Sequence, residues 1–297
     1  MKPFWPLIAP AAVLTLLCSP SLAQSDPAPV LGVTHPTSNH AVELPIQLYR
    51  DYLVVVEGKI GNLEKLSFLI DTGASPSVID QRIATALGLK RTPGKMDLAN
   101  KTVQTELATL PFIEVGPARA EGLPIFVQDL SSIEKRLGRR IDAVVGLDIL
   151  GKRSFSIHYK TKQLRFGPVE RTRSTVSFEP GTPFVIVEVR LHNRPVRLLV
   201  DTGASALMLF QSHVTDPLFL LTGRTSKTTN LGGDFQRQPV QIPGTRLGKE
   251  EFGPLTGFVV ADHGDDGRIF DGLLSVRGLH LEEIGFDFEN HEISWKK

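Results

Sequence analysis

Cysteine is almost absent from this sequence, and Cys18 is the only one. A chain with a single cysteine cannot form an internal disulfide, so its stability must come from packing. An excess of either charge is lacking as well, because 33 Lys and Arg residues are balanced by 32 Asp and Glu residues. Without a basic excess, the sequence gives no reason to expect nucleic acid or an anionic membrane surface as a partner.

Long apolar runs are also lacking, apart from one near the N-terminus. Lys2 is the only charged residue of segment 1–23, an apolar run follows at 6–18, and Ser21 and Ala23 are small residues at the −3 and −1 positions. This pattern predicts a cleaved secretory signal peptide over 1–23. An uncleaved anchor is the alternative, although the run is short for a membrane span.

Cleavage after Ala23 would remove Cys18, which excludes a cysteine nucleophile and a thiolate metal site from the mature chain. We then expect a periplasmic or secreted protein with no stable membrane insertion after signal cleavage. Residues 24–42 are rich in Pro, Ser and Thr and show little periodicity. They are predicted to form a flexible lead-in.

The rest of the sequence contains an internal repeat with a period of about 130 residues. Four segments of the first copy recur in the same order in the second. The pairs are VEGKIGN at 56–62 with VEVRLHN at 187–193, FLIDTGAS at 68–75 with LLVDTGAS at 198–205, IDAVVGLDIL at 141–150 with FDGLLSVRGL at 270–279, and FSIHYKTKQLRF at 155–166 with IGFDFENHEISW at 284–295. Four collinear pairs indicate duplication of one unit. We therefore predict two pseudo-symmetric lobes, at 43–170 and 171–297.

Within each copy the pattern is mostly that of β-strands, because apolar residues recur at every second position before each Asp-Thr-Gly. These apolar residues are Leu66, Phe68 and Ile70 in the first copy and Val196, Leu198 and Val200 in the second. Helix signals are few: a cap at Asp80 with an end at Gly88, and a short segment from 131 to 138. The predicted fold class is all-β, with two β-barrel-like lobes and a few short helices.

The repeated Asp-Thr-Gly-Ala-Ser carries the candidate chemistry. A pseudo-twofold axis would bring Asp71 and Asp201 face to face, and two close carboxyl groups share a proton over a wide pH range. The ionised aspartate could accept a proton from a water held between them, while the protonated one polarises a peptide carbonyl. This chemistry needs no metal or cofactor. The predicted turn-supporting residues are Thr72, Gly73, Ser75, Thr202, Gly203 and Ser205.

On these motifs, together with Val144-Val145-Gly146, the chain resembles the retropepsin-like aspartic proteases, duplicated in one chain as in the bilobal pepsin-like enzymes. It is most similar to exported bacterial proteins that carry two such units in tandem. The resemblance covers residues 45–297 and implies the bilobal aspartic-protease fold. It also implies that Asp71 and Asp201 are catalytic and that the substrate is a peptide or protein. A monomer would suffice for a complete active site.

The sequence departs from the family pattern in ways that affect the expected activity. Ser275 stands where the first copy has Gly146, so the segment behind the second turn is expected to be distorted. Ala74 and Ala204 replace the hydroxyl residue that donates to the outer carboxylate oxygen in pepsin-like enzymes. Losing that donor raises the pKa of the pair, so the predicted pH optimum is less acidic than that of pepsins.

The flap regions expected over the site, 96–104 and 229–237, contain no tyrosine. The side chains predicted to cover a substrate are Leu98, Asn100, Leu231 and Phe235. Two functions remain open from the residues alone. One is an aspartic endopeptidase, of broad specificity or dedicated to one envelope protein. The other is a peptide-binding or scaffold protein with little or no turnover.

Overall fold

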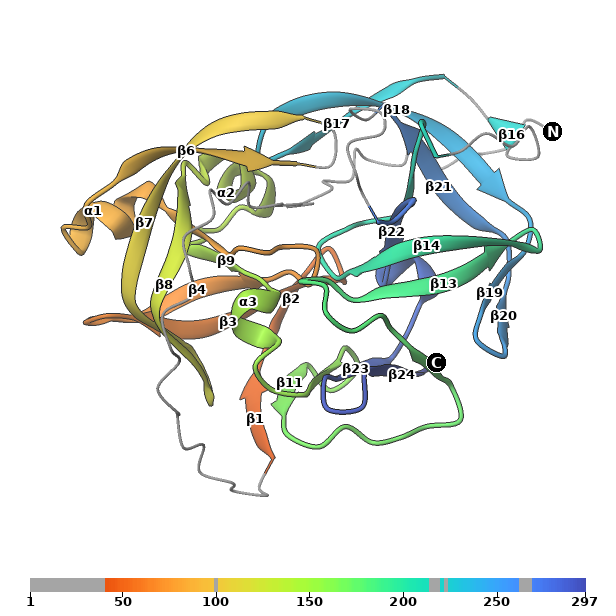
Figure 1. The fold of residues 1–297 in the computed structure, drawn as a ribbon, viewed down its shortest axis with the longest axis horizontal. Helices are drawn as coiled ribbons and strands as arrows, with labels where there is room; N and C mark the ends of the chain where they lie inside the picture. Colours follow the sequence, from red (N-terminus) through yellow and green to blue (C-terminus); the bar gives the residue numbers. More distant parts are fainter. Residues whose placement is uncertain (1–40, 99–100, 214–219, 222–223, 262–268) are drawn as a thin grey trace.

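The structure is a computed structural model that describes residues 41–98, 101–213, 220–221, 224–261 and 269–297. The predicted signal peptide 1–23 and almost all of the lead-in 24–42 lie outside these residues. Two lobes built mainly of strands lie side by side above a third sheet in the view of Figure 1. The prediction of an all-β, two-lobed fold is confirmed. No helix in the described ranges is both long and apolar enough to cross a membrane.

The first lobe is an eight-stranded sheet with three short helices among its described residues. In sheet order the strands are β2 (Gln47–Tyr49), β3 (Leu53–Ile60), β4 (Leu63–Ile70), β9 (Ala143–Val145), β5 (Val78–Asp80), β8 (Ala118–Gln128), β7 (Thr102–Val115) and β6 (Thr92–Asp97). The helices are α1 (Gln81–Ala86), α2 (Ser131–Leu137) and α3 (Leu147–Leu150). As predicted, Asp80 caps α1 by accepting from the Arg82 amide at 2.8 Å.

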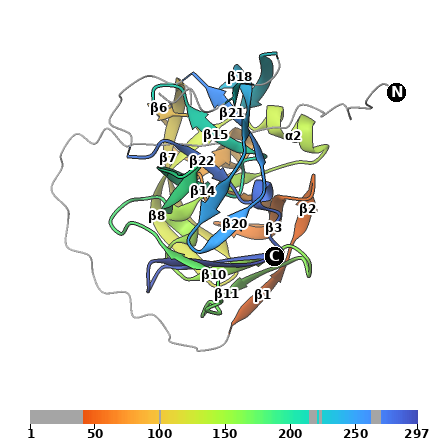
Figure 2. The same ribbon diagram turned by 90° about the vertical axis from the view of Figure 1, so that its right-hand side faces the viewer.

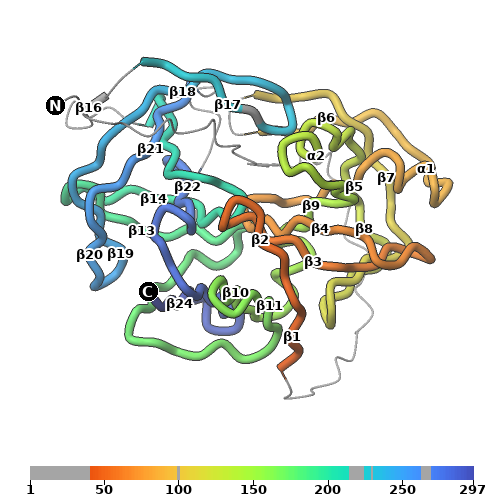
Figure 3. Tube along the Cα trace, turned by 180° about the vertical axis from the view of Figure 1, so that it is seen from behind, coloured from red at the N-terminus to blue at the C-terminus, as the bar shows by residue number. Residues whose placement is uncertain are grey.

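The second lobe repeats this plan with a ten-stranded sheet in the described part of the chain. Its path runs β16 (Leu220–Leu221), β18 (Gly233–Ile242), β21 (Leu255–Val260), β15 (Leu207–Phe210), β22 (Gly272–Ser275), β14 (Arg194–Asp201), β13 (Ile186–Leu191), β19 (Thr245–Leu247) and β20 (Glu250–Phe252), and β17 (Ser226–Asn230) pairs with β18. The 3-10 helix η1 (Arg277–Leu279) follows β22. In Figure 3, seen from behind, the hairpin β17–β18 extends toward β6 of the first lobe.

The third sheet takes strands from both repeats. In order they are β1 (Val42–Pro45), β11 (Gln163–Phe166), β10 (Phe155–His158), β23 (Glu283–Asp287), β24 (Glu292–Lys296) and β12 (Thr175–Ser177). The repeats meet where β10 pairs with β23, and the rings of Phe155 and Phe286 stack there with centroids 4.8 Å apart. Figure 2 shows β1, β10 and β11 together below the lobes. We call this the shared sheet.

Candidate functional site

Both Asp-Thr-Gly turns begin at the end of an apolar strand that is held from one side by a parallel partner. β4 pairs with β9 and β14 with β22, in equivalent registers. The Asp71 amide continues the first pairing by donating to the Val145 carbonyl at 3.0 Å. Because both strands are buried in their sheets, the two aspartates leave the core at equivalent points of the two lobes.

The threonines of the two turns bind each other across the lobes. The Thr72 amide donates to the Thr202 hydroxyl oxygen at 3.0 Å, and the Thr202 amide donates to that of Thr72 at 3.1 Å. Each hydroxyl also donates to a carbonyl of the opposite strand, Thr72 to Val200 at 2.8 Å and Thr202 to Ile70 at 3.3 Å. These buried bonds fix the position of one turn relative to the other.

The two carboxyl groups face the partner turn and are held by backbone amides. The Gly73 amide donates to Asp71 Oδ1 at 2.8 Å. The amides of Gly203 and Ala204 both donate to Asp201 Oδ1, at 2.7 and 2.8 Å. A Cβ atom on Gly73 would lie 2.7 Å from Cγ of Asp201, so only glycine allows this approach. Both aspartates have an exposed fraction of 0%.

Burial raises the pKa of Asp71 well above its usual value, and the neighbouring charge of Asp201 raises it further. A hydrogen bond between the two carboxyl groups acts in the same direction, whereas the amides of Gly73 and Gly203 lower the pKa. The raising causes prevail because two buried carboxylates in contact cannot both ionise easily. The pair therefore holds a proton at pH values where an isolated aspartate has lost it.

Tyr52, just before β3, is a site residue that the sequence analysis missed. Its side chain lies beside the hydroxyl of Ser205, in electrostatic reach of Asp201, and burial raises its pKa to about 12. The guanidinium of Arg277 lies 4.9 Å from the centre of its ring. Ser75 and Ser205 are both buried. Because Tyr52 lies beside Ser205, a tyrosine of the first lobe supports the turn of the second lobe.

The segment behind each turn is intact in both lobes. In the first, the Leu147 amide donates to the Ala74 carbonyl at 2.9 Å, and a Cβ atom on Gly146 would lie 2.0 Å from that oxygen. In the second, the Ser275 hydroxyl donates to the Ala204 carbonyl at 2.7 Å. The parallel register of β14 and β22 continues through Ser275. The expected distortion is therefore wrong, because the serine side chain supplies the donor.

The predicted covering side chains lie next to the turns. Leu98 and Leu231, from different lobes, are buried in one apolar cluster with Tyr52 and Ala74 of the first turn. Phe235 packs on the corresponding cluster of the second lobe, which includes Ala204. Asn100 lies outside the described residues.

The hairpins β6–β7 and β17–β18 also touch each other. A Cβ atom on Gly232 would lie 2.5 Å from Cδ1 of Leu98 and 2.6 Å from Cε of Lys101. Arg136, in the last turn of α2, forms an ion pair of 3.8 Å with Asp234 near the tip of the second hairpin. This contact between hairpins agrees with the complete burial of both aspartates.

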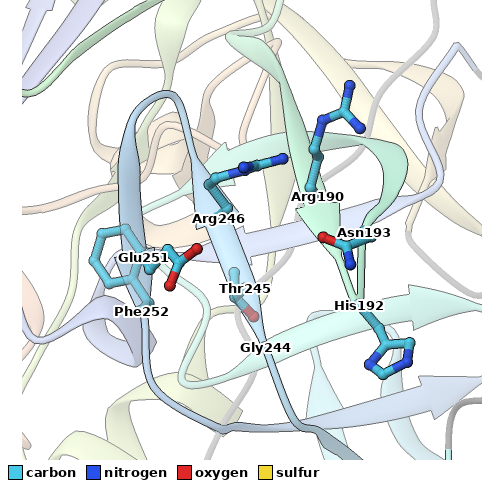
Figure 4. Close-up of a pocket in the computed structure, with 8 residues that line it drawn as sticks. All are labelled: Arg190, His192, Asn193, Gly244, Thr245, Arg246, Glu251 and Phe252. Atoms are coloured by element: carbon cyan, nitrogen blue, oxygen red, sulfur yellow. The ribbon is translucent and has the colours of Figure 1, made fainter.

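An open pocket elsewhere in the second lobe contains no residue of either turn. Figure 4 shows Arg190 of β13 and Arg246 of β19 side by side, with Glu251 of β20 beyond them. These residues are cross-strand neighbours in register, so Glu251 offsets the charge of Arg246. The pocket is therefore a feature of the strand edges, remote from the two turns.

A family model described as aspartyl protease matches residues 56–149 and 187–277. The two matched ranges cover both repeats, each with its Asp-Thr-Gly turn, and amount to more than half of the chain. No curated protein matches the chain.

Proposed function

Because the chain belongs to the aspartyl protease family, we propose that it is an endopeptidase that uses Asp71 and Asp201 as catalytic residues. The observation that carries this proposal is the meeting of two interlocked Asp-Thr-Gly turns at a buried, proton-sharing pair of carboxyl groups. Such a pair can deprotonate a water and protonate a carbonyl at the same time. A peptide bond is the bond that this chemistry is suited to hydrolyse.

In the proposed mechanism Asp201 is the ionised partner and Asp71 carries the shared proton. The amides of Gly203 and Ala204 donate to Asp201 Oδ1, and donors to a carboxylate favour its charged form. Burial and the charge of Asp201 hold the pKa of Asp71 well above its usual value, so the proton is assigned to Asp71. Asp201 takes a proton from the attacking water while Asp71 gives its proton to the carbonyl oxygen. The resulting gem-diol collapses as a proton passes to the nitrogen and the C–N bond breaks, which yields an acid and an amine.

The other predicted site residues would position this pair. Thr72 and Thr202 hold the turns together, and Gly73 and Gly203 give the amides and the close approach. Ser75 and Ser205 are buried in the same two turns. Substrate entry requires the two hairpins to separate, because the aspartates are covered. Leu98, Asn100, Leu231 and Phe235 would then line the substrate.

A second candidate function is peptide binding without useful turnover. The observation that favours it is the full burial of both carboxyl groups beneath hairpins that contact each other. A scaffold protein would keep this arrangement and never admit a water and a scissile bond together. The two candidates differ in one measurable respect, which is whether any peptide is cut.

The test is to incubate the mature protein with a peptide library between about pH 3 and pH 8, alongside Asp71→Asn and Asp201→Asn. We expect products with the wild type and none with either variant, while the exposed-site control Asp129→Asn retains activity. Cleavage that survives both active-site changes would rule out the paired-carboxyl mechanism. Binding of peptides without cleavage at any pH would support the scaffold function. Maximal cleavage below about pH 3 would contradict the predicted shift of the optimum.

We also propose that residues 1–23 direct export to the periplasm or the medium, and that 43–170 and 171–297 are the two lobes. The signal pattern in the sequence supports the first proposal, and the repeat supports the second. N-terminal sequencing of the exported protein tests the signal. A mature chain that begins at Gln24 is expected, and an unprocessed Met1 would indicate the anchor instead.

A further inference from the structure

Arg237 is a buried cation next to the proposed active site, and its charge has no partner in the described chain. It lies on β18 of the second-lobe hairpin, and only 4% of it is exposed. Its Nη1 atom is buried without a hydrogen-bond partner, and its Nε donates to the Ser226 hydroxyl at a long 3.3 Å. No carboxylate of the described residues forms an ion pair with it.

The contacts that Arg237 does make cannot offset the loss of water around its charge. The guanidinium lies 3.6 Å from the centre of the Phe258 ring, and a stacked cation of this kind gains some electrostatic stabilisation from the ring. That gain is smaller than the cost of removing water from a buried charge that forms no ion pair. Burial accordingly lowers the pKa of the guanidinium, even though it remains charged at neutral pH. A buried cation with no acidic partner among the described residues is suited to an anion that arrives from outside.

Two neighbours relate the position of Arg237 to the second turn. Phe235, two residues earlier on the same side of β18, packs on the apolar cluster that contains Ala204 of the second turn. Tyr52 lies in electrostatic reach of both Arg237 and Asp201. The guanidinium is therefore on the face of the hairpin that is directed at the turns.

The first lobe has no equivalent of this group. In the hairpin β6–β7, Gly94 pairs with Thr105 at the place where Ser226 pairs with Arg237 in β17–β18. The Thr105 hydroxyl is satisfied by the Val127 carbonyl at 2.9 Å. A pseudo-symmetric core requires no arginine at this point, so packing alone does not explain Arg237.

We propose that Arg237 is a specificity-determining residue that binds an acidic side chain of the peptide substrate, on the side of the scissile bond that lies under the second-lobe hairpin. Arg277, which lies over the Tyr52 ring, adds positive charge to that region. The inference rests on the proposed endopeptidase function and adds a substrate class to it.

The test compares peptides that carry Glu or Gln at each position around the scissile bond, with kcat/KM as the readout. The wild type should favour Glu at one position by at least about tenfold, since a buried donor left without its acceptor strongly disfavours the analogue. In Arg237→Met this ratio should fall to about one or below, because the new side chain is apolar. Arg237→Lys, which keeps the charge but not the planar donor pair, should give an intermediate ratio. The control Arg190→Met, in the remote pocket of Figure 4, should keep the wild-type ratio.

The outcomes separate this inference from the proposed function. Cleavage by the wild type with no preference for Glu at any position would overturn the acidic specificity and leave the endopeptidase in place. A Glu preference that persists in Arg237→Met would show that another group binds the acid. Failure of Arg237→Met to fold would make the guanidinium a structural group and also overturn the proposal. The absence of any cleavage by the wild type would instead refute the endopeptidase function itself.

Discussion

At the scale of single residues, Thr72 and Thr202 connect the two lobes more directly than any other pair described at the site. Each hydroxyl accepts an amide proton from the opposite turn and donates to the opposite strand. Because all of these groups are buried, neither water nor another side chain replaces a lost partner. Removing one hydroxyl therefore leaves an amide and a carbonyl unsatisfied.

We predict that Thr72→Val lowers the free energy of unfolding by about 1–3 kcal/mol, the cost of buried groups left unpaired, and also lowers kcat. Valine has nearly the same volume as threonine, so packing is retained. Thr72→Ser should recover most of both quantities. Urea unfolding and peptide kinetics measure the effects. The control Thr109→Val, at an exposed position of β7, should stay within about 0.5 kcal/mol of wild type. If Thr72→Val and Thr109→Val lowered the free energy of unfolding equally, the hydrogen bonds between the turns would not be the cause.

The raised pKa of Asp71 makes a second prediction about stability and pH. In the folded state Asp71 keeps its proton at pH values where the unfolded chain, with a pKa of about 3.9, has lost it. The folded protein then binds more protons, so stability falls as pH rises from about 4 through the folded-state pKa, by at most about 1.4 kcal/mol per pH unit. Below about pH 4 this contribution is fully present.

Asp71→Asn should flatten that pH dependence, because the amide cannot ionise. The measurement is the free energy of urea unfolding at several pH values from about 4 upward. Asp129→Asn provides the comparison, since its carboxyl group is exposed and has a lowered pKa. An Asp71→Asn profile as steep as that of the wild type would place the titrating group elsewhere.

Sequence reasoning at this scale succeeded for Asp71 and Asp201 as partners in space, because a repeated motif in a duplicated unit implies a symmetric meeting point. Tyr52 was missed because reasoning from the repeat finds only residues that both copies share. It has no counterpart in the second copy, where Pro183 stands at the matching offset of 131 residues, and its contact with Ser205 crosses between lobes. Arg237 was missed because a charged residue in a strand is usually exposed. Only the burial of its side chain in the structure distinguishes Arg237 from an exposed arginine in a strand.

At the scale of elements, the strands were predictable from alternation and the helix α1 from its cap, because these signals are local. The repeated segments 155–166 and 284–295 form equivalent hairpins, β10–β11 and β23–β24. The contact between the hairpins β6–β7 and β17–β18 was not predictable. It depends on how the lobes are placed, which neither Leu98 nor Leu231 reveals in sequence.

The hairpin contact yields a prediction of its own. Gly232→Val would place a side chain against Leu98 and Lys101 and force the tips apart. We expect kcat/KM to fall by roughly tenfold, the scale of a mispositioned substrate contact, and amide exchange in 226–242 to accelerate. Gly253→Val is the matched control, because a Cβ atom there meets nothing within 4 Å. Unchanged kinetics in Gly232→Val would mean that the tips take no part in the reaction.

At the scale of the whole molecule, the shared sheet joins the lobes into one folding unit. β10 of the first repeat and β23 of the second are direct neighbours, and Phe155 stacks on Phe286 between them. The proposed boundary near 170 falls in the connection from β11 to β12, two strands of this same sheet. The repeat pattern predicted two units but not this third sheet. In the sequence, the strands of the shared sheet lie at the end of each repeat, and nothing there indicates that they pair across the repeats.

We therefore predict a single thermal transition, with calorimetric and van't Hoff enthalpies that agree. Phe155→Ala should lower the free energy of unfolding by about 3–5 kcal/mol, as expected for a buried phenylalanine, and should leave the transition single. Val42→Ala, at an exposed position on the edge strand β1, serves as the control. Two resolved transitions would show that the lobes unfold independently.

The pairing of β10 with β23 also sets an order of events during synthesis. Residues 155–158 must wait for 283–287, more than a hundred residues later, before their edge is covered. At usual translation speeds this delay lasts on the order of ten seconds. During that interval the Phe155 ring and an open strand edge are available to chaperones or to a neighbouring nascent chain, so this edge is where misassembly would begin.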